Sequence, residues 1–415
     1  MSARGLWHNG DYLKLLTGQT ISSIGSSMSS FVFVLIGLAI TGSPVQAGLI
    51  GTAGALGQTL MSLPGGALAD RWNRRRIMVG YSLFGTVLYG SVAVAGWLDV
   101  LTLPHLIAVS LLSGAGYVLF IPAEAGALRQ IVDPDDISTA LAASHGRQNL
   151  AALIGAPLGG LLYSIGRVIP VAIDAVSYLV MTVMLTTIRH PLPAAKPDGD
   201  KHEPMLKAIR SGLTWMFRQP ALRTIAIVAT ILNFAANGTF IVLILSMQQR
   251  GVPTPVIGLL ETGLGVGGLL GAIAAPKLLA KFSTGRITIA SGWITSVTFG
   301  ATAFTTHAAV LIVLPALAIF LLPALNSGLF GYQMLITPDN LQGRAQSAVM
   351  FLASSTNPLA PLLGGLLLEG LGSRSALLVF GGLLVLSAAL LTLSRPIRTI
   401  PLLSAVSPTP TPTPS

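Results

Sequence analysis

The chain contains no cysteine, and only 9% of its 415 residues are charged. The missing thiols exclude disulfide bonds, cysteine nucleophiles and cysteine-ligated metal or iron–sulfur centres. The low charge excludes an ordinary soluble domain, in which about a quarter of the residues are charged. The six histidines are scattered, and no nucleophile motif or phosphate-binding loop is present. We therefore expect neither an enzyme nor a bound metal or other cofactor.

Long hydrophobic runs fill most of the chain, and 52% of its residues are hydrophobic. A helix that crosses the hydrocarbon core needs about 20 mostly apolar residues. By this measure we predict an all-α membrane protein that crosses a lipid bilayer, and no signal-peptide cleavage site follows the first run. The predicted spans are Tyr12–Ile40, Val45–Gly66, Ile77–Leu98, Leu101–Leu128, Ser138–Ile165, Val168–Ile188, Ala221–Met247, Val256–Ala275, Ile287–Thr305, Ala308–Leu335, Ala345–Leu368 and Ala376–Leu393.

The positions of the basic residues predict the orientation of the chain. Alternating the loops between two sides places all 24 lysines and arginines on one side except Arg167, Arg250 and Arg374. Basic residues concentrate on the cytoplasmic side of membrane proteins. We therefore expect a multi-pass protein of a bacterial-type plasma membrane with both termini in the cytoplasm. This asymmetry explains the net charge of +10 better than binding to nucleic acid does.

The chain repeats itself at nearly half its length, because Arg76-Ile77 matches Arg286-Ile287 and Gly159-Gly160 matches Gly364-Gly365. Such a repeat predicts two six-helix bundles of the same orientation, twelve membrane-spanning helices in all. Residues 204–218 of the linker have the pattern of an amphipathic helix at the membrane surface. The predicted parts are an N-terminal bundle (1–188), a cytoplasmic linker (189–220), a C-terminal bundle (221–394) and a disordered, Pro/Thr-rich tail (395–415).

A turn with four arginines and one aspartate, Pro64–Arg76, joins the second and third predicted spans. Lipid tolerates neither these charges nor unpaired backbone, so the turn must lie at a membrane surface. Asn73 is suited to a left-handed backbone position in it. The turn can be read as an ordinary basic loop. Its spacing also resembles the signature between helices 2 and 3 of the major facilitator superfamily.

The residues that match this signature are Gly66, Leu68, Asp70, Arg71, Arg74 and Arg75, while Asn73 stands where the family usually has glycine. In the family, the aspartate holds the cytoplasmic side closed in the outward-open state. The resemblance therefore implies a gating motif. Its members are Gly66, Asp70, Arg71, Arg74 and Arg75.

Polar side chains within the predicted spans are candidates for a substrate cavity. Gln19, Ser22 and Ser26 share one face of the first span, which suits a helix beside a wet cavity, or alternatively close packing of small residues against a neighbouring helix. Asparagines form a pair in the seventh span and interrupt the tenth and eleventh. The candidates for the cavity are Gln19, Ser22, Ser26, Asn233, Asn237, Asn326 and Asn357.

The fifth span carries small residues around a proline, in the order Gly155, Pro157, Gly159 and Gly160. Glycines allow close helix packing, and a proline removes one backbone donor, so we predict a bend here. The segment resembles the antiporter motif of the superfamily, glycine-proline-x-x-glycine-glycine, with the proline displaced by one residue.

Carboxylates inside the membrane are candidates for proton coupling, because an isolated charge there costs several kcal/mol. Glu261 is the leading candidate and Asp174 the second. Glu124 is a third, although it and Arg147 can instead neutralise one another in a structural pair. We expect Glu369 to lie at the outer surface.

Three further segments, Phe120–Arg129, Ile173–Tyr178 and Gly258–Gly271, are similar to the bacterial drug-efflux branch that contains macrolide exporters and the enterobactin exporter. This resemblance implies two bundles that rock about a central site and export a small hydrophobic or amphipathic compound in exchange for protons. We expect a functional monomer. Two alternatives stay open, which are proton-coupled uptake of a small polar metabolite and a membrane sensor or scaffold of the same fold that transports nothing.

Overall fold

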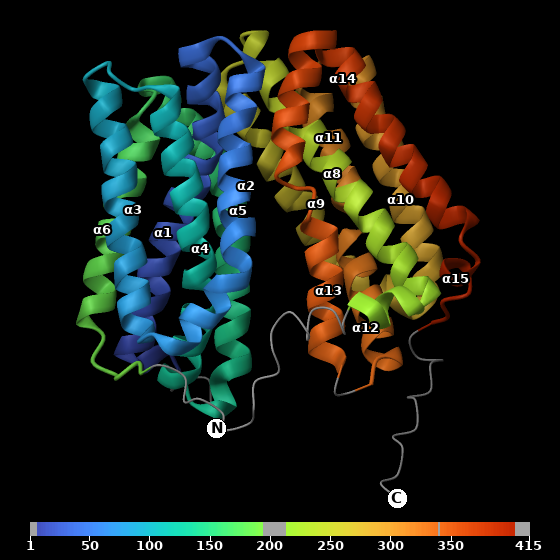
Figure 1. Cartoon of the computed structure of the whole chain (residues 1–415), viewed down its shortest axis with the longest axis horizontal. Coiled ribbons are helices and arrows are strands. Elements are labelled where there is room, and N and C mark those ends of the chain that lie inside the picture. The colour runs from blue at the N-terminus through green and yellow to red at the C-terminus, as the bar shows by residue number, and fades with distance from the viewer. Residues whose placement is uncertain (1–5, 194–212, 339–340, 403–415) are drawn as a thin grey trace, which may run out of the picture. The chain divides into compact units, whose positions relative to one another are not determined.

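The computed structural model describes residues 6–193, 213–338 and 341–402. Every regular element in these ranges is a helix, as Figure 1 shows. The chain divides into two compact units. Unit 1 combines the N-terminal half with Ile244–Thr262 and Pro361–Glu369, and unit 2 holds the rest. The domain boundaries remain predictions, and most of the linker and of the tail lies outside the described residues.

Unit 1 is built on six long helices that follow one another along the chain. α2 packs closely against α4, while α1 lies against α5 and α6 and α3 lies against α6 (Figure 1). The elements are η1 (Leu6–His8), α1 (Gly10–Thr41), α2 (Pro44–Arg71), α3 (Arg74–Trp97), α4 (Leu103–Ile131), η2 (Pro134–Asp136), α5 (Ile137–Ile165) and α6 (Ile169–Thr187).

Side-chain caps fix where the first three long helices begin. The Asn9 side chain accepts hydrogen bonds from the first turn of α1, and Ser43 does the same for α2. Asn73 caps α3 by accepting a hydrogen bond of 3.2 Å from the backbone N–H of Arg76. Its φ of −60° and ψ of 122° are extended. The prediction of a left-handed Asn73 was therefore wrong, because asparagine is also one of the best N-cap residues.

Glycines bring the backbones of α2 and α4 into contact. A Cβ atom on Gly57 would collide with the carbonyl oxygen of Leu111, and one on Gly114 with that of Gly54. Backbone oxygens cannot turn aside as a flexible side chain can. The α2–α4 contact therefore requires glycine at these positions.

We expect Gly57→Ala to destabilise unit 1, because the added methyl group forces two helices apart. Overpacking of this kind typically costs about 1–3 kcal/mol, which a lower thermal midpoint in detergent would reveal. Gly80→Ala is the matched control, since Gly80 lies inside α3 with nothing within 4 Å of the added Cβ. It should gain up to ~1 kcal/mol from helix propensity. Equal midpoints for Gly57→Ala and the wild type would contradict the packing argument.

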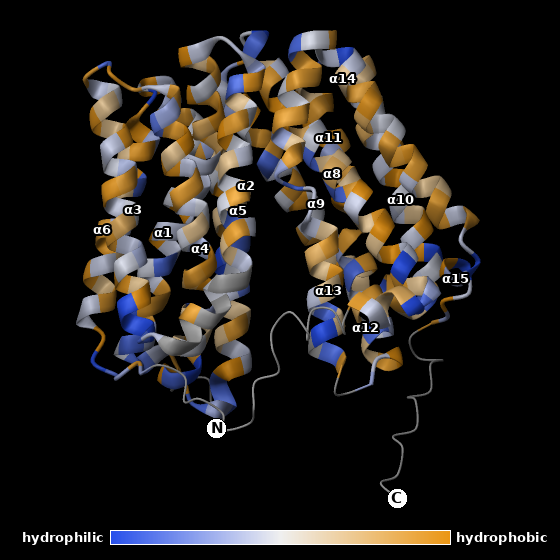
Figure 2. Ribbon diagram, in the orientation of Figure 1, coloured by the Kyte–Doolittle hydropathy of each residue, from blue (hydrophilic) through white to orange (hydrophobic). Residues whose placement is uncertain are grey.

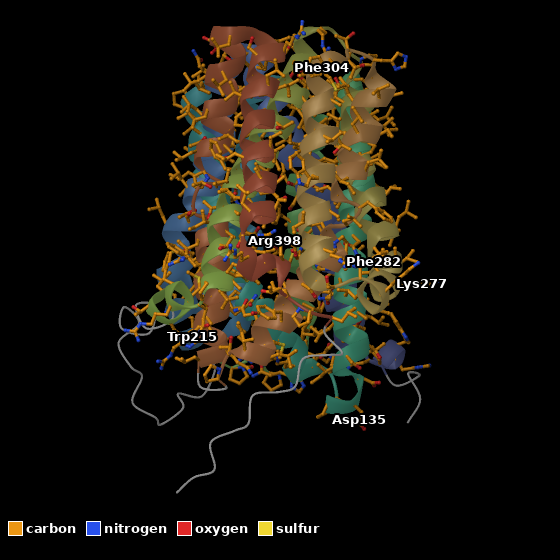
Figure 3. All side chains as sticks on the ribbon, turned by 90° about the vertical axis from the view of Figure 1, so that its right-hand side faces the viewer. Asp135, Trp215, Lys277, Phe282, Phe304 and Arg398 are labelled. Atoms are coloured by element: carbon orange, nitrogen blue, oxygen red, sulfur yellow. The ribbon has the colours of Figure 1, made fainter. Side chains whose placement is uncertain are left out.

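Unit 2 is also helical, and three of its helices contribute segments to unit 1. Phe304 lies at the opposite end of unit 2 from Trp215 (Figure 3). The elements are α8 (Pro220–Gln249), α9 (Thr254–Lys281), α10 (Thr284–Ala301), η3 (Thr302–Phe304), α11 (Ala308–Ile319), α12 (Leu322–Ile336), α13 (Gln342–Ser354), α14 (Leu359–Leu393) and α15 (Arg395–Arg398).

The tenth predicted span, Ala308–Leu335, is not one continuous helix. α11 ends at Ile319 and α12 begins at Leu322. Pro323 explains the break, because it lacks the N–H that would bond to the Ile319 carbonyl and its ring would clash with that carbonyl. Asn326 was predicted to interrupt this span, but it lies within α12.

The eleventh predicted span, Ala345–Leu368, is broken in the same way. α13 ends at Ser354 and α14 begins at Leu359. Pro358 removes the donor that the Ser354 carbonyl would need to continue the helix. Asn357 lies in this break.

Nine helical segments among the described residues are long and apolar enough to cross a membrane. One of them, Arg344–Leu393, has 50 residues and turns at Gly372, whose φ of 77° suits glycine, so it provides two crossings. α2 and α5, with 28 and 29 residues, bring the total to twelve. Hydrophobic residues cover the lengths of these helices (Figure 2). The predicted all-α fold class is confirmed.

Candidate functional site

A cavity of about 600 Å³ opens in unit 1 and is lined by all six of the helices α1 to α6. Its volume is in the range of sites that hold drug-sized molecules. The predicted candidates Gln19, Ser22 and Ser26 all line it. The other lining residues include Ser23, Ser27, Ser30, Phe33, Val34, Ile50, Gln58, Tyr81, Tyr89, Ser110, Ser113, Tyr117, Phe120, Arg147, Gln148, Tyr178 and Met181.

The cavity changes from polar to apolar along α1. Gln19 lies near one end of the lined stretch, whereas Phe33 and Val34 lie at the other. A rise of 1.5 Å per residue separates Gln19 from Val34 by about 22 Å. Phe33 packs against Tyr89 with a centroid distance of 5.4 Å and belongs to a buried hydrophobic cluster with Ile50. The wall is thus amphipathic, and along α1 it passes from amide and hydroxyl groups to hydrocarbon, while serines and apolar side chains of the other helices are interspersed.

Three tyrosines form the middle of the cavity wall. The Tyr178 hydroxyl lies 3.0 Å from that of Tyr81 and accepts a hydrogen bond of 3.0 Å from Ser26. Tyr89 stacks on Tyr178 with a centroid distance of 5.5 Å. A Cβ on Gly85 would approach the Tyr178 ring to 2.7 Å, so glycine makes room for this ring.

This tyrosine cluster was not predicted from the sequence. A signal was available, because Tyr81, Gly85 and Tyr89 recur at intervals of four residues and therefore share one face of α3. Tyr178 comes from α6 and could be joined to them only by the tertiary fold.

Asp174 is completely buried beside the cavity. Its Oδ1 accepts a hydrogen bond of 3.0 Å from Ser177, while its Oδ2 has no hydrogen-bond partner among the described residues. Gly25 of α1 closes the site, because a Cβ there would come within 2.5 Å of Oδ1. Asp174 itself does not line the cavity, but its neighbour on the same face, Tyr178, does.

Glu124 and Arg147 form an ion pair of 2.7 Å between α4 and α5. Arg147 also donates a hydrogen bond of 3.2 Å to Ser23 of α1. The two partners are not equivalent, because Arg147 lines the cavity and Glu124 does not.

Glu261 is half-buried in α9, and none of the hydrogen bonds or ion pairs found in the described ranges involves its side chain. Its neighbour Thr262 donates a hydrogen bond of 2.8 Å to the Leu153 carbonyl. This is the carbonyl that Pro157 leaves without a helical donor. The contact explains how α5 continues as one helix through the proline, and the predicted bend remains a prediction.

The glycines of the predicted bend motif are packing surfaces. Gly160 faces the Thr254 carbonyl, with 2.6 Å from an added Cβ to that oxygen. Gly155 and Gly159 lie against Ser27 and Met28 of α1. The motif therefore holds α5 against both α1 and the first turn of α9.

The four asparagine candidates belong to unit 2, and none of them lines the cavity of unit 1. Asn233 donates a hydrogen bond of 3.0 Å to the Ala353 carbonyl and so joins α8 to α13. Asn237 donates to the Asn233 carbonyl at 2.8 Å. Asn326 is exposed in α12, and Asn357 has a buried Oδ1 with no partner in the described ranges. A role of these residues in substrate binding stays a prediction.

Part of the predicted gating motif binds backbone carbonyls within unit 1. Arg74 donates a hydrogen bond of 3.0 Å to the Gly126 carbonyl at the end of α4. Arg75 donates at 2.8 Å to the His190 carbonyl, just beyond α6, and also contacts the Ile188 carbonyl. The side chains of Asp70 and Arg71, and Gly66, lie outside the residues whose burial and contacts are described.

Twelve membrane-spanning helices with a drug-sized amphipathic cavity define a multi-pass transporter fold. The chain belongs to the Major Facilitator Superfamily, whose family model matches residues 15–356 and, in a second match, residues 226–414. The second match begins near the start of the C-terminal repeat predicted from the sequence.

Two similar curated proteins are bacterial transporters. The multidrug efflux pump Tap of Mycolicibacterium fortuitum is 25% identical over 384 residues, which cover 89% of this chain and 92% of Tap. The MFS-type transporter YfiS of Bacillus subtilis is 26% identical over 391 residues, which cover 90% of each protein.

Solved structures show the same fold at lower identity. The structure of the nucleoside transporter NupG matches with a TM-score of 0.74 at 13% identity, and the match covers 92% of this chain and 98% of the NupG chain. A bacterial homologue of the iron transporter ferroportin has a TM-score of 0.71 at 16% identity, with 94% of this chain and 99% of its own covered.

Proposed function

We propose that this protein exports small amphipathic compounds from the cell in exchange for protons. The amphipathic cavity of unit 1 is the observation that supports this most strongly. Its hydroxyl and amide groups can hydrogen-bond the polar part of a compound, and its apolar side chains, among them Phe33 and Val34, can bury the hydrocarbon part. Similarity to the efflux pump Tap supports the direction of transport.

Uptake of a small polar metabolite is the second candidate. The seven serines of the cavity wall favour it, and the fold is shared with a nucleoside transporter. The apolar side chains of the wall, such as Phe33, Val34 and Ile50, argue against it, because a polar metabolite would leave them without a partner.

The test is a transport screen with the purified protein in liposomes, with and without an imposed pH gradient. Export in exchange for protons predicts that amphipathic compounds accumulate only when protons flow down the imposed pH gradient in the opposite direction. Gradient-dependent movement of polar metabolites alone, in the direction of the protons, would support uptake. A protein that moves no compound under either condition would be a sensor or scaffold.

For the gating motif we propose that Asp70 stabilises the cytoplasmically closed state. Asp70→Asn should then keep its expression and affinity but turn over about tenfold more slowly, because a loss of ~1.4 kcal/mol alters a conformational equilibrium and leaves the cavity intact. Measuring the dissociation constant and the transport rate of one compound separates the two effects. Ala280→Asp, at the corresponding position of the second repeat, is the control. Normal turnover of Asp70→Asn would contradict the gate.

A further inference from the structure

Arg147 is a charged side chain held in the wall of the cavity. Only 5% of it is exposed. A guanidinium group carries five N–H donors. Among the described residues, Nη2 of Arg147 donates a hydrogen bond of 2.7 Å to Glu124, and Nη1 donates one of 3.2 Å to Ser23. Its Nε is buried without a partner in the described part of the chain.

A buried cation with unused donors is costly unless an acceptor reaches it. The lining of the cavity offers no carboxylate for this purpose, since Arg147 is the one charged residue in the part of the wall that the structure describes. Glu124 approaches Arg147 from outside the lining and satisfies a single N–H. An acceptor in the cavity would meet Arg147 through the Nη donors that Glu124 and Ser23 leave unused, since Nε itself is buried.

The polar residues near Arg147 are neutral, such as Gln19, Ser22 and Gln148. Tyrosine faces can attract cations; Tyr89 and Tyr178 cover one face of each other by stacking and Tyr81 meets Tyr178 edge to face, whereas Tyr117 is exposed. The charged group that the described wall presents to a bound compound is thus Arg147, while Glu124 and Asp174 lie behind the lining.

We infer that Arg147 binds an oxygen acceptor at the polar end of the transported compound, so that the cavity selects anionic and neutral amphipathic molecules over lipophilic cations. This inference rests on the proposed export function and specifies its substrate class. The compound would place a carboxylate or carbonyl oxygen against Arg147 and its hydrocarbon body toward Phe33 and Val34.

Three pyrene probes with one hydrocarbon body and different head groups can test this inference. The head groups are a carboxylate, a neutral amide and a trimethylammonium, and binding to the purified protein in detergent is followed by fluorescence anisotropy. We expect the carboxylate probe to bind most tightly and the ammonium probe most weakly. A hydrogen bond to a charged group predicts a difference of about tenfold to hundredfold between them.

The test variant is the double substitution Arg147→Gln with Glu124→Gln, which removes both charges and leaves neither one buried alone. In this variant the three probes should bind within about threefold of one another. Arg129→Gln is the matched control, because Arg129 is an exposed arginine of the same region at the end of α4 and does not line the cavity. It should keep the wild-type order.

Several results would overturn the inference. These are failure of the carboxylate probe to bind, tighter binding of the ammonium probe to the wild type, and an unchanged order in a folded double variant. The export proposal is judged separately in liposomes. Gradient-driven transport of the ammonium probe without a carboxylate preference would support export and overturn the role of Arg147. Preserved head-group selectivity without transport of any probe would contradict export and leave the binding site intact.

Discussion

Glu261→Gln is expected to abolish proton-driven accumulation while leaving exchange of the transported compound intact. Glutamine keeps the size and hydrogen bonding of Glu261 but cannot carry a proton. An inward gradient of one pH unit is worth ~1.4 kcal/mol per proton. If the membrane potential is held at zero and one proton is exchanged for each neutral molecule, the wild type should accumulate the compound about tenfold. The variant should only equilibrate, with a ratio of about one. Accumulation and counterflow in liposomes measure the two properties separately.

Asp174→Asn distinguishes the two carboxyl groups. Asp174 is sealed by Gly25 and Ser177, whereas Glu261 is half-buried with no partner in the described residues. We therefore expect Asp174→Asn to keep accumulation. If accumulation survives in Glu261→Gln and is lost in Asp174→Asn, the proton is carried by α6. If both variants accumulate normally, neither carboxyl group couples transport to protons.

Labelling of single cysteines should show on which side of the membrane each of two turns lies. The chain has no cysteine of its own, so Gln249→Cys and Arg76→Cys each introduce one thiol. Both positions are exposed, next to Arg250 and Arg75 respectively. A membrane-impermeant thiol reagent added to intact cells should label Gln249→Cys alone, because the predicted orientation puts the turn before α3 in the cytoplasm.

Permeabilised cells provide the control for this experiment, since both thiols should then react. Labelling of Arg76→Cys in intact cells would reverse the predicted orientation. Labelling of both thiols in intact cells would show that the two turns lie on the same side, which is incompatible with the number of spans between them.

The sequence predicted the elements of this fold that depend on local chemistry. Apolar runs of membrane length located the spans, and the stripe of Gln19, Ser22 and Ser26 located one wall of the cavity. The breaks after Ile319 and Ser354 lie four residues before Pro323 and Pro358, but a proline alone does not predict a break, because Pro122 and Pro157 lie inside continuous helices.

Other features depend on contacts between distant segments. The pairing of Tyr81 with Tyr178, the Thr262 hydroxyl that bonds to the Leu153 carbonyl, and the exposure of Arg147 but not Glu124 to the cavity all require the tertiary fold. The asparagines were expected in the cavity because they are polar within a span. Asn233 satisfies a backbone carbonyl of a neighbouring helix, a contact that periodicity does not reveal, and its place in a cavity stays a prediction.

The central claim is that the cavity of unit 1 holds the transported compound, and protection of an introduced thiol tests it most directly. Ser30→Cys places a thiol at an exposed position of the cavity wall. Ser327→Cys, exposed in α12 of unit 2, is the control. We expect a saturating concentration of a transported compound to slow labelling of Ser30→Cys about tenfold or more, as occupancy of the site requires, and to leave Ser327→Cys unchanged. Unchanged labelling of Ser30→Cys at saturation, or protection of Ser327→Cys alone, would contradict the claim.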